Sequence, residues 1–167
     1  MWAAGPPGAC GPVPPPALPT AGMSPGAHGR RTMKERALGI GIIGAGQAGQ
    51  RHAQAFARLA DGVRIVGVAD VDEARAQALA SACGARAFTD GRALLDERPD
   101  AVVISLPHHL HKEAGLAAAE AGAHILMEKP LAPTLEDAQA LVEACRKHGV
   151  CLAVGFVHRY RTEFQEA

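Results

Sequence analysis

The sequence predicts an α/β fold in which a doubly wound parallel sheet carries helices on both faces. Short apolar runs alternate along the chain with Ala-rich amphipathic segments, which is the pattern of repeated strand–helix units. A glycine-rich turn joins the first apolar run to the first amphipathic segment. The 167 residues suffice for one domain, and because only 4% are aromatic, its core must consist mainly of Ala, Val, Leu and Ile.

Six apolar runs, several of them rich in β-branched residues, are the predicted strands. Runs that are apolar throughout are typical of strands covered by helices on both faces. In chain order, the predicted strands are residues 38–43, 63–69, 85–88, 101–106, 123–127 and 150–154.

Five amphipathic segments between these runs are the predicted helices. A glycine follows three of them where a left-handed C-cap is expected: Gly84, Gly122 and Gly149. Thr134 and Asp137 have the spacing of a capping box at the start of the fifth helix. In chain order, the predicted helices are residues 47–59, 72–82, 92–96, 108–121 and 135–148.

Composition excludes several classes of partner. Lys plus Arg and Asp plus Glu both number 17, so no basic surplus exists to attract nucleic acid or an acidic membrane. No apolar run approaches the roughly 18 residues of a membrane span. The four cysteines form no C-x-x-C pair, which favours reduced thiols in a cytoplasmic protein over a disulfide framework or a zinc site.

The first 33 residues differ in composition from the rest of the chain. Residues 1–32 hold eight Pro and six Gly, and their only formally charged residues are Arg30 and Arg31. We expect residues 1–33 to be a disordered Pro/Gly-rich tail without chemistry of its own. Two alternatives are a targeting peptide, since acidic residues are absent, and a true start at Met33.

The turn after the first predicted strand fits the G-x-G-x-x-G pattern with Gly44, Gly46 and Gly49. Such glycines permit a tight turn, close approach of a pyrophosphate to the backbone, and packing of the helix on the sheet. The helix N-terminus then offers N–H groups to the phosphates. Ala45 and Gln47 belong to the same predicted cofactor-binding turn. The alternative is a glycine-rich turn that binds nothing.

Asp70 ends the second predicted strand, 21 residues past Gly49. A carboxylate there accepts hydrogen bonds from the adenosine-ribose hydroxyls and repels a 2′-phosphate, so it predicts NAD, with NADP possible as a second cofactor. Arg75, one turn into the next helix, is either part of a solvated helix face or a phosphate ligand. Enzymes that use S-adenosylmethionine are an alternative for this half of the pattern, because they also combine a glycine-rich turn with an acidic ribose ligand.

A polar cluster follows the fourth predicted strand, at the sheet edge where open α/β folds bind ligands. Pro107 is followed there by His108, His109 and His111. Three histidines so close together are compatible with a metal site, but no cluster of Cys, Asp or Glu completes a ligand set. We therefore predict no metal, and histidines that are solvated or face the cofactor.

A second cluster, Glu128-Lys129-Pro130, follows the fifth predicted strand. A lysine at this edge, beside a bound nicotinamide, could donate to a substrate oxygen or lower the pKa of a neighbouring group. The alternative is a surface lysine paired with Glu128. Spacing alone does not separate these hypotheses.

Four stretches in this order resemble the Gfo/Idh/MocA family of NAD(P)-dependent oxidoreductases. They are residues 41–49 followed by His52, 68–70, 107–111 and 128–130. The resemblance covers about residues 37–164 and implies a Rossmann-type NAD(P)-binding domain, which we place at residues 34–155.

The family resemblance also implies roles for individual residues. Gly44, Gly46 and Gly49 would hold the pyrophosphate, and Asp70 the ribose. Glu128 and Lys129 would lie beside the nicotinamide. Lys129, which would touch the substrate or the catalytic base, is the predicted catalytic residue. Pro107, His108 and His111 would lie near the cofactor, although the family usually has Asn where this chain has His108.

Members of this family have a second α/β domain that supplies most substrate contacts, the oligomer interface and a catalytic Asp/His pair. We expect residues 156–167 to be a truncated start of the connection to that domain, and this chain alone to be inactive. The predicted function is thus the NAD(P)-binding domain of an enzyme that oxidises a sugar- or cyclitol-like alcohol, a homo-oligomer only with the second domain. Alternatives are a non-catalytic NAD-binding module and part of an NAD-dependent glycosidase.

Overall fold

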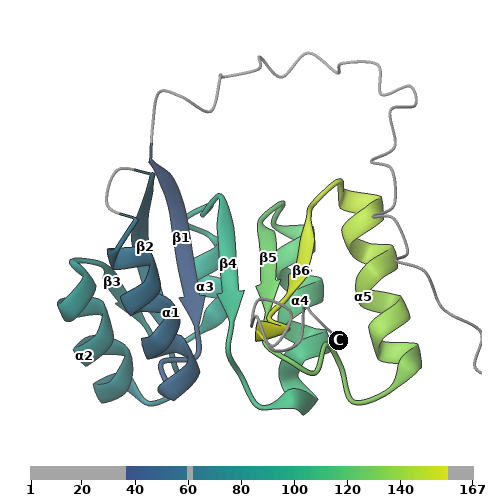
Figure 1. The fold of residues 1–167 in the computed structure, drawn as a ribbon, viewed down its shortest axis with the longest axis horizontal. Helices are drawn as coiled ribbons and strands as arrows, with labels where there is room; N and C mark the ends of the chain where they lie inside the picture. Colours follow the sequence, from purple (N-terminus) through teal and green to yellow (C-terminus); the bar gives the residue numbers. More distant parts are fainter. Residues whose placement is uncertain (1–36, 60–61, 158–167) are drawn as a thin grey trace, which may run out of the picture. The chain divides into compact units, whose positions relative to one another are not determined.

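The computed structural model describes residues 37–59 and 62–157. The predicted tail, residues 1–33, and all but the first two residues of the predicted connecting segment, 156–167, lie outside the described residues. Within the described residues, six strands form one parallel sheet in the order β3-β2-β1-β4-β5-β6 (Figure 1). The predicted doubly wound parallel sheet is confirmed.

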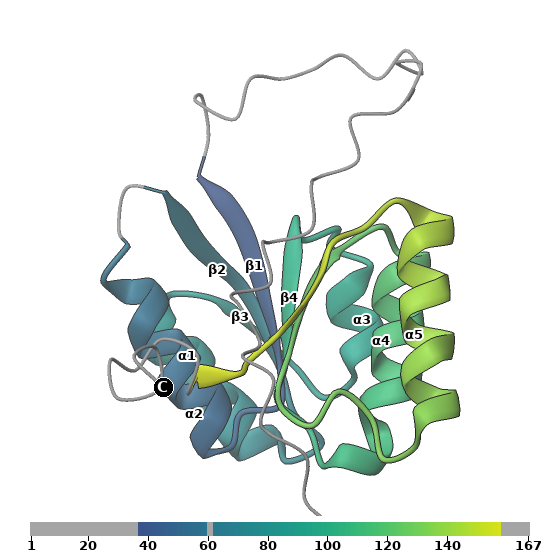
Figure 2. The same cartoon turned by 45° about the vertical axis from the view of Figure 1, so that its right-hand side comes forward.

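The strands begin and end close to their predicted positions. They are β1 (Leu38–Ile43), β2 (Val63–Ala69), β3 (Arg86–Phe88), β4 (Ala101–Ile104), β5 (His124–Met127) and β6 (Leu152–Val154). The helices are α1 (Gln47–Ala57), α2 (Glu73–Cys83), α3 (Gly91–Leu95), α4 (His111–Glu120) and α5 (Leu135–His148). Helices α1 and α2 cover one face of the sheet, and α3, α4 and α5 lie on the other (Figure 2).

The strand order reverses between β1 and β4. From β1 the chain builds outward to β2 and β3, and then returns to β4 and builds outward to β5 and β6 on the other side. The two central strands are paired in parallel, with Ile43 opposite Ile104 at their carboxyl ends. Open α/β sheets bind ligands at such a reversal, outside the carboxyl ends of the strands.

Aliphatic side chains fill both faces of the sheet, as the low aromatic content predicts. On the α1 and α2 face, Ile42 and Val68 are completely buried and cluster with Ala53 and Ala80 of the two helices. On the other face, a larger cluster contains Leu94, Val102, Ile104, Met127 and Leu141. This packing holds the strand ends in fixed positions and thus fixes the groups that follow them. None of the described helices is both long and apolar enough to cross a membrane.

Helix ends follow the predicted capping pattern, with one exception. Gly84, Gly122 and Gly149 all have positive φ, between 64° and 78°. Thr134 Oγ1 accepts a hydrogen bond from Asp137 N at 3.1 Å, as in a capping box. The Asp137 carboxylate is directed elsewhere, however, and accepts a hydrogen bond from Lys112 Nζ of α4 at 2.7 Å.

The prediction of one helix over residues 108–121 is wrong in its first turn. Residues His108–Leu110 form a 3₁₀ turn, and α4 begins at His111. The preceding strand also ends at Ile104, before its predicted end. Pro107 is the N-cap residue of the 3₁₀ turn, and it has no N–H with which to continue the strand ladder beyond this point.

Candidate functional site

The three glycines of the turn between β1 and α1 differ in the space available for a side chain. Gly44 has a φ of +102°, and a Cβ there would lie 2.5 Å from the carbonyl oxygen of Ser105. A Cβ on Gly49 would collide with the carbonyl oxygen of Gly44. A Cβ on Gly46, in contrast, would meet no atom within 4 Å. The first and third glycines are therefore needed by the fold itself, whereas Gly46 leaves open space above the turn.

The N-terminus of α1 faces this open space. Gly46 is the N-cap residue, and no side chain caps the helix. Gln47, the first helical residue, is exposed. Uncapped N–H groups at a helix N-terminus bind anions, helped by the helix dipole. Together with the open position at Gly46, they fit a bound pyrophosphate.

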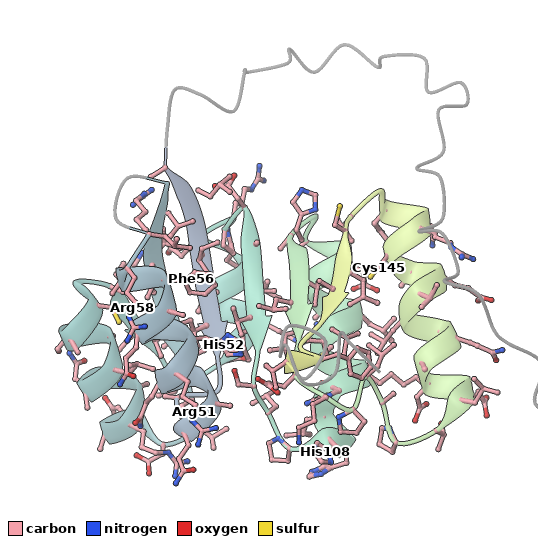
Figure 3. All side chains as sticks on the ribbon, viewed as in Figure 1. Arg51, His52, Phe56, Arg58, His108 and Cys145 are labelled. Carbon is pink, nitrogen blue, oxygen red and sulfur yellow. The ribbon has the colours of Figure 1, made fainter. Side chains whose placement is uncertain are left out.

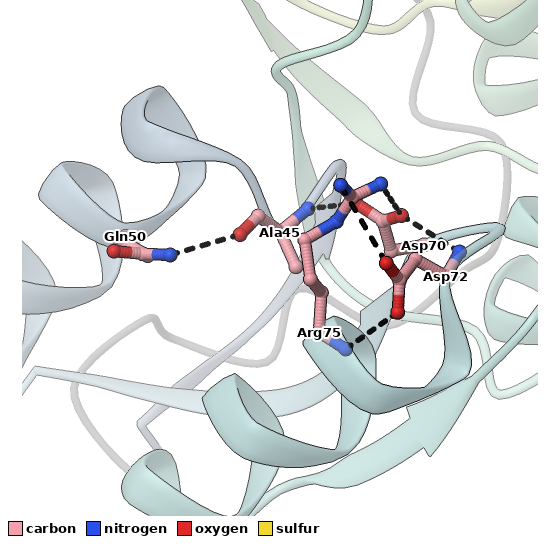
Figure 4. Close-up of polar contacts among 5 residues, drawn as sticks. All are labelled: Ala45, Gln50, Asp70, Asp72 and Arg75. Carbon is pink, nitrogen blue, oxygen red and sulfur yellow. Dashed lines mark hydrogen bonds and ion pairs between the residues drawn. The ribbon is translucent and has the colours of Figure 1, made fainter.

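Asp70, at the end of β2, is joined to the glycine-rich turn (Figure 4). Its Oδ2 accepts a hydrogen bond from Ala45 N at 2.8 Å, and its Oδ1 accepts one from Asp72 N at 2.9 Å. Ala45 is itself completely buried and supports the turn from beneath, and its carbonyl accepts a hydrogen bond from Gln50. A direct contact between Ala45 and a dinucleotide therefore stays a prediction.

The charge state of Asp70 follows from these contacts. Burial acts to raise the pKa of Asp70, but hydrogen bonds from Asp72 N, the Arg75 guanidinium and Ala45 N outweigh it and hold this pKa below its usual value. Asp70 is thus ionised at neutral pH. An ionised carboxylate is an acceptor only, as binding of two ribose hydroxyls requires.

Arg75 lies at the edge of the site and contacts Asp70. Its Nη2 is 2.9 Å from Asp70 Oδ1, and its Nη1 is 3.6 Å from Asp72 Oδ2. The Arg75 side chain is 53% exposed, whereas that of Asp70 is 9% exposed. The interpretation of Arg75 as part of a solvated helix face is therefore incomplete, because its guanidinium is paired with the predicted ribose ligand.

An apolar cleft of about 240 Å³ opens beside Asp70. It runs between the ends of β2 and β3 and the start of α4, with Val71, Thr89, Leu106 and Leu110 among its lining residues. Val71 is 90% exposed, although it is apolar. A flat, largely apolar group placed against Val71 and Leu106 would lie next to the Asp70 carboxylate.

The three histidines after β4 lie in different surroundings. His108 is exposed (Figure 3), as are His109 and Pro107, whereas His111 is completely buried. The His111 Nδ1 lies 2.9 Å from the carbonyl oxygen of Pro130, and its Nε2 lies 2.9 Å from that of Leu106. Direct contact of the His111 ring with a cofactor would require one of these contacts to break.

Glu128 and Lys129 follow β5, at the same edge of the sheet as the glycine-rich turn. Glu128 Oε1 lies 2.8 Å from Nε2 of His52, which extends from α1 and stacks on Phe56 (Figure 3). Lys129 is exposed, and its backbone N–H donates to Glu128 Oε2 at 3.2 Å. The alternative of a Lys129–Glu128 side-chain pair is not found among the described residues, because the Glu128 carboxylate is paired with His52.

Within residues 37–59 and 62–157, no group of three or more metal-ligating side chains lies close enough together to hold a metal ion. The buried ring of His111 is directed at two carbonyl oxygens, and its exposed neighbours have no carboxylate or thiolate partner that would complete a ligand set.

Comparison with known protein families agrees with this geometry. Residues 38–156 match the model of the Gfo/Idh/MocA family, described as an oxidoreductase family with an NAD-binding Rossmann fold. The chain belongs to this family. It forms the family's NAD-binding domain, and the alternative of an S-adenosylmethionine enzyme is set aside.

Two curated relatives resemble the chain over most of its length. Inositol 2-dehydrogenase 3 of Saccharopolyspora erythraea is 39% identical over 129 residues, which cover 76% of this chain and 38% of that protein. D-glucoside 3-dehydrogenase of Escherichia coli is 38% identical over 140 residues, 82% of this chain and 40% of that protein. The chain thus spans about two fifths of the length of these relatives.

A similar solved structure agrees with this assignment. The WlbA dehydrogenase of Bordetella pertussis, solved in complex with NADH and UDP-GlcNAcA, is 34% identical and has a TM-score of 0.69. The likeness covers 71% of this chain and 37% of that one. NAD is therefore the cofactor of the family domain to which this chain corresponds.

Sequence reasoning gave no role to His52 and did not find the cleft. His52 lies three residues past Gly49, one helical turn along α1, so helical spacing was the available signal. The cleft combines side chains from several loops, and no local pattern marks it. The buried hydroxyl of Ser105, just past β4, has no partner among the described residues and was not predicted as a polar group at this edge.

Proposed function

We propose that the dinucleotide lies across the carboxyl ends of the strands, with its pyrophosphate over Gly46. Asp70 would accept hydrogen bonds from the adenosine ribose, and the adjacent apolar cleft would take the adenine. The nicotinamide half would then extend the other way, toward the ends of β4 and β5. The observation that carries the proposal is the open position above Gly46 next to the ionised Asp70.

In the complete enzyme, we propose, this domain serves oxidation of a sugar- or cyclitol-like alcohol. Bound NAD supplies the hydride acceptor. Lys129 is exposed at the nicotinamide end, where its Nζ can orient a substrate hydroxyl or take part in moving its proton. The sugar and cyclitol substrates named for the relatives support this substrate class. Homo-oligomerisation through the second domain and a cytoplasmic location are parts of the same proposal.

Fluorescence titration of the chain with NADH and NADPH tests the binding part. We expect saturable binding of NADH that is tighter than that of NADPH, because a 2′-phosphate would approach the Asp70 carboxylate. Absence of NADH binding would contradict the proposal. In any longer form of the protein, a separate assay with inositol and D-glucosides would distinguish three cases. A dehydrogenase accumulates NADH, a glycosidase cleaves the glucoside without accumulating NADH, and a non-catalytic binding module does neither.

Replacement of Asp70 by Ala should weaken NADH binding and reduce the preference of the chain for NADH over NADPH. Loss of hydrogen bonds to a charged acceptor costs about 1.5–3 kcal/mol, so the dissociation constant for NADH should rise about ten- to hundredfold. Removal of the carboxylate also frees the Arg75 guanidinium, which can then pair with a 2′-phosphate. The ratio of the two dissociation constants, measured by fluorescence titration, should therefore change toward NADPH.

The double variant Asp70→Ala/Arg75→Ala is the matched control for this prediction. It should bind NADH as weakly as Asp70→Ala does. Its affinity for NADPH should be lower than that of Asp70→Ala, because Arg75 is no longer there to pair with the 2′-phosphate. An unchanged ratio in the single variant would count against the ribose role of Asp70.

Replacement of Lys129 by Ala should separate binding from turnover. The Lys129 side chain is exposed, so its removal should change the NADH dissociation constant less than about threefold. In any longer form of the protein that turns over, the same change should abolish activity, because the group beside the substrate oxygen is lost. Wild-type kcat/KM in that variant would refute the assignment.

A further inference from the structure

Two histidines from different helices hold the segment Glu128–Pro130 at its two ends. His52 of α1 contacts the Glu128 carboxylate at 2.8 Å. His111 of α4 contacts the Pro130 carbonyl oxygen at 2.9 Å. The exposed Lys129 lies between these two fixed points. We propose that His52 and His111 are positioning residues, which fix this segment against the nicotinamide half of the dinucleotide; the inference rests on the proposed function.

The contact at Glu128 connects the phosphate-binding helix to the end of β5. His52 lies one turn past Gly49 on α1, and its Nε2 contacts Glu128 Oε1 just past the end of β5. The two side chains are only 19% and 21% exposed, which limits competition from water for their hydrogen bond. The other carboxylate oxygen, Oε2, accepts a hydrogen bond from Lys129 N. The Glu128 carboxylate therefore connects α1 to the backbone of Lys129, so the position of α1 helps to fix the position of that backbone.

The contact at Pro130 connects the same segment to the end of β4. His111 is 0% exposed, and its second ring nitrogen contacts the carbonyl oxygen of Leu106. Carbonyl oxygens only accept, so a His111 ring nitrogen that carries a proton donates its hydrogen bond to the loop that faces it. A buried side chain between two backbone carbonyls has no surface for a ligand. His111 can therefore affect a bound dinucleotide only by fixing the two loops that it contacts.

The two nucleoside halves of the dinucleotide make this inference testable. Asp70 and the cleft lie on the β2 side of the glycine-rich turn, whereas Glu128–Pro130 lies on the β5 side. ADP-ribose contains the adenosine half and the pyrophosphate but no nicotinamide ring. A positioning defect in Glu128–Pro130 should therefore weaken NADH binding and leave ADP-ribose binding unchanged.

The experiment measures NADH and ADP-ribose dissociation constants for the full chain and its His52→Ala, His52→Gln and His111→Gln variants. We expect about tenfold weaker NADH binding in His52→Ala and His111→Gln, with ADP-ribose affinity within twofold of wild type. His52→Gln keeps a donor toward Glu128 and should recover part of the loss. The fluorescence of bound NADH at saturation should also change, because it reports the surroundings of the nicotinamide ring.

His148→Ala, at the exposed end of α5, is the control and should leave both affinities unchanged. Because His111 is buried, the folding of His111→Gln must be checked by circular dichroism and thermal unfolding. If this variant does not fold, the variants His52→Ala and His52→Gln decide the question, because His52 is partly exposed. Equal weakening of both ligands, or no change in either, would overturn the inference. A wild-type chain that binds neither ligand would overturn the proposed function instead.

Discussion

The Gly46→Val variant should fold like the wild-type chain and lose dinucleotide binding. The added side chain meets no atom within 4 Å of its Cβ, and the φ of −69° at Gly46 is accessible to any residue. The valine would occupy the space into which a pyrophosphate must come to reach the N–H groups of α1. Loss of two charge-assisted hydrogen bonds costs about 3–6 kcal/mol, so NADH affinity should fall more than about hundredfold.

Fluorescence titration and urea unfolding, done on the same preparation, check both halves of this prediction. The free energy of unfolding should fall by no more than about 1 kcal/mol, since valine is a poorer N-cap than glycine. Ala55→Val, on an exposed position of the same helix, is a matched control for the added volume and should bind NADH like wild type. NADH binding retained in Gly46→Val would mean that the pyrophosphate lies elsewhere.

The parts of the site that sequence predicts are those encoded within one strand–helix unit. The spacing of Gly44, Gly46 and Gly49 specifies a turn whose backbone, rather than its side chains, would contact a pyrophosphate. Prediction of this part therefore does not depend on where side chains lie. Asp70 is found for a related reason, because the end of β2 necessarily lies beside the end of β1 in a parallel pair. Such features depend on local pattern and on neighbouring strands alone.

The parts that sequence does not predict depend on the order of the strands. His52 and Glu128 are 76 residues apart in the chain and meet because β5 lies beside β4, which in turn lies beside β1. Hydrophobic periodicity predicts strands and helices but carries no information about that order. The burial of His111 is missed for a similar reason, since its carbonyl partners belong to two loops that only the fold brings together.

The resulting site has two sides that are built differently. On the β2 side, Asp70 accepts hydrogen bonds from the backbone of Ala45 and Asp72, so its carboxylate is fixed by local contacts. On the β5 side, Glu128 and Pro130 are fixed by histidines from two separate helices. Relative movement of α1 and α4 would disturb the β5 side first. The two sides should therefore respond separately to substitution.

The Gly49→Ala variant should be strongly destabilised, although it makes the same chemical change as Gly46→Ala. In an exposed helix, Gly→Ala stabilises by about 1 kcal/mol. At Gly49 the added Cβ would collide with the carbonyl oxygen of Gly44, which is backbone held in the turn and cannot rotate away as a side chain can. Overpacking of this kind costs about 1–3 kcal/mol or more, so sterics should outweigh helix propensity.

We expect urea unfolding to show a loss of about 2–3 kcal/mol in Gly49→Ala, against no more than about 1 kcal/mol in Gly46→Ala. Gly49→Ala should lose stability and, because its turn is displaced, NADH affinity as well. Gly46→Ala should lose mainly NADH affinity. Equal stability of the two variants would show that α1 can shift away from the turn. In that case, close packing of α1 against the turn would not explain the glycine at position 49. Binding of the dinucleotide would then have to explain it.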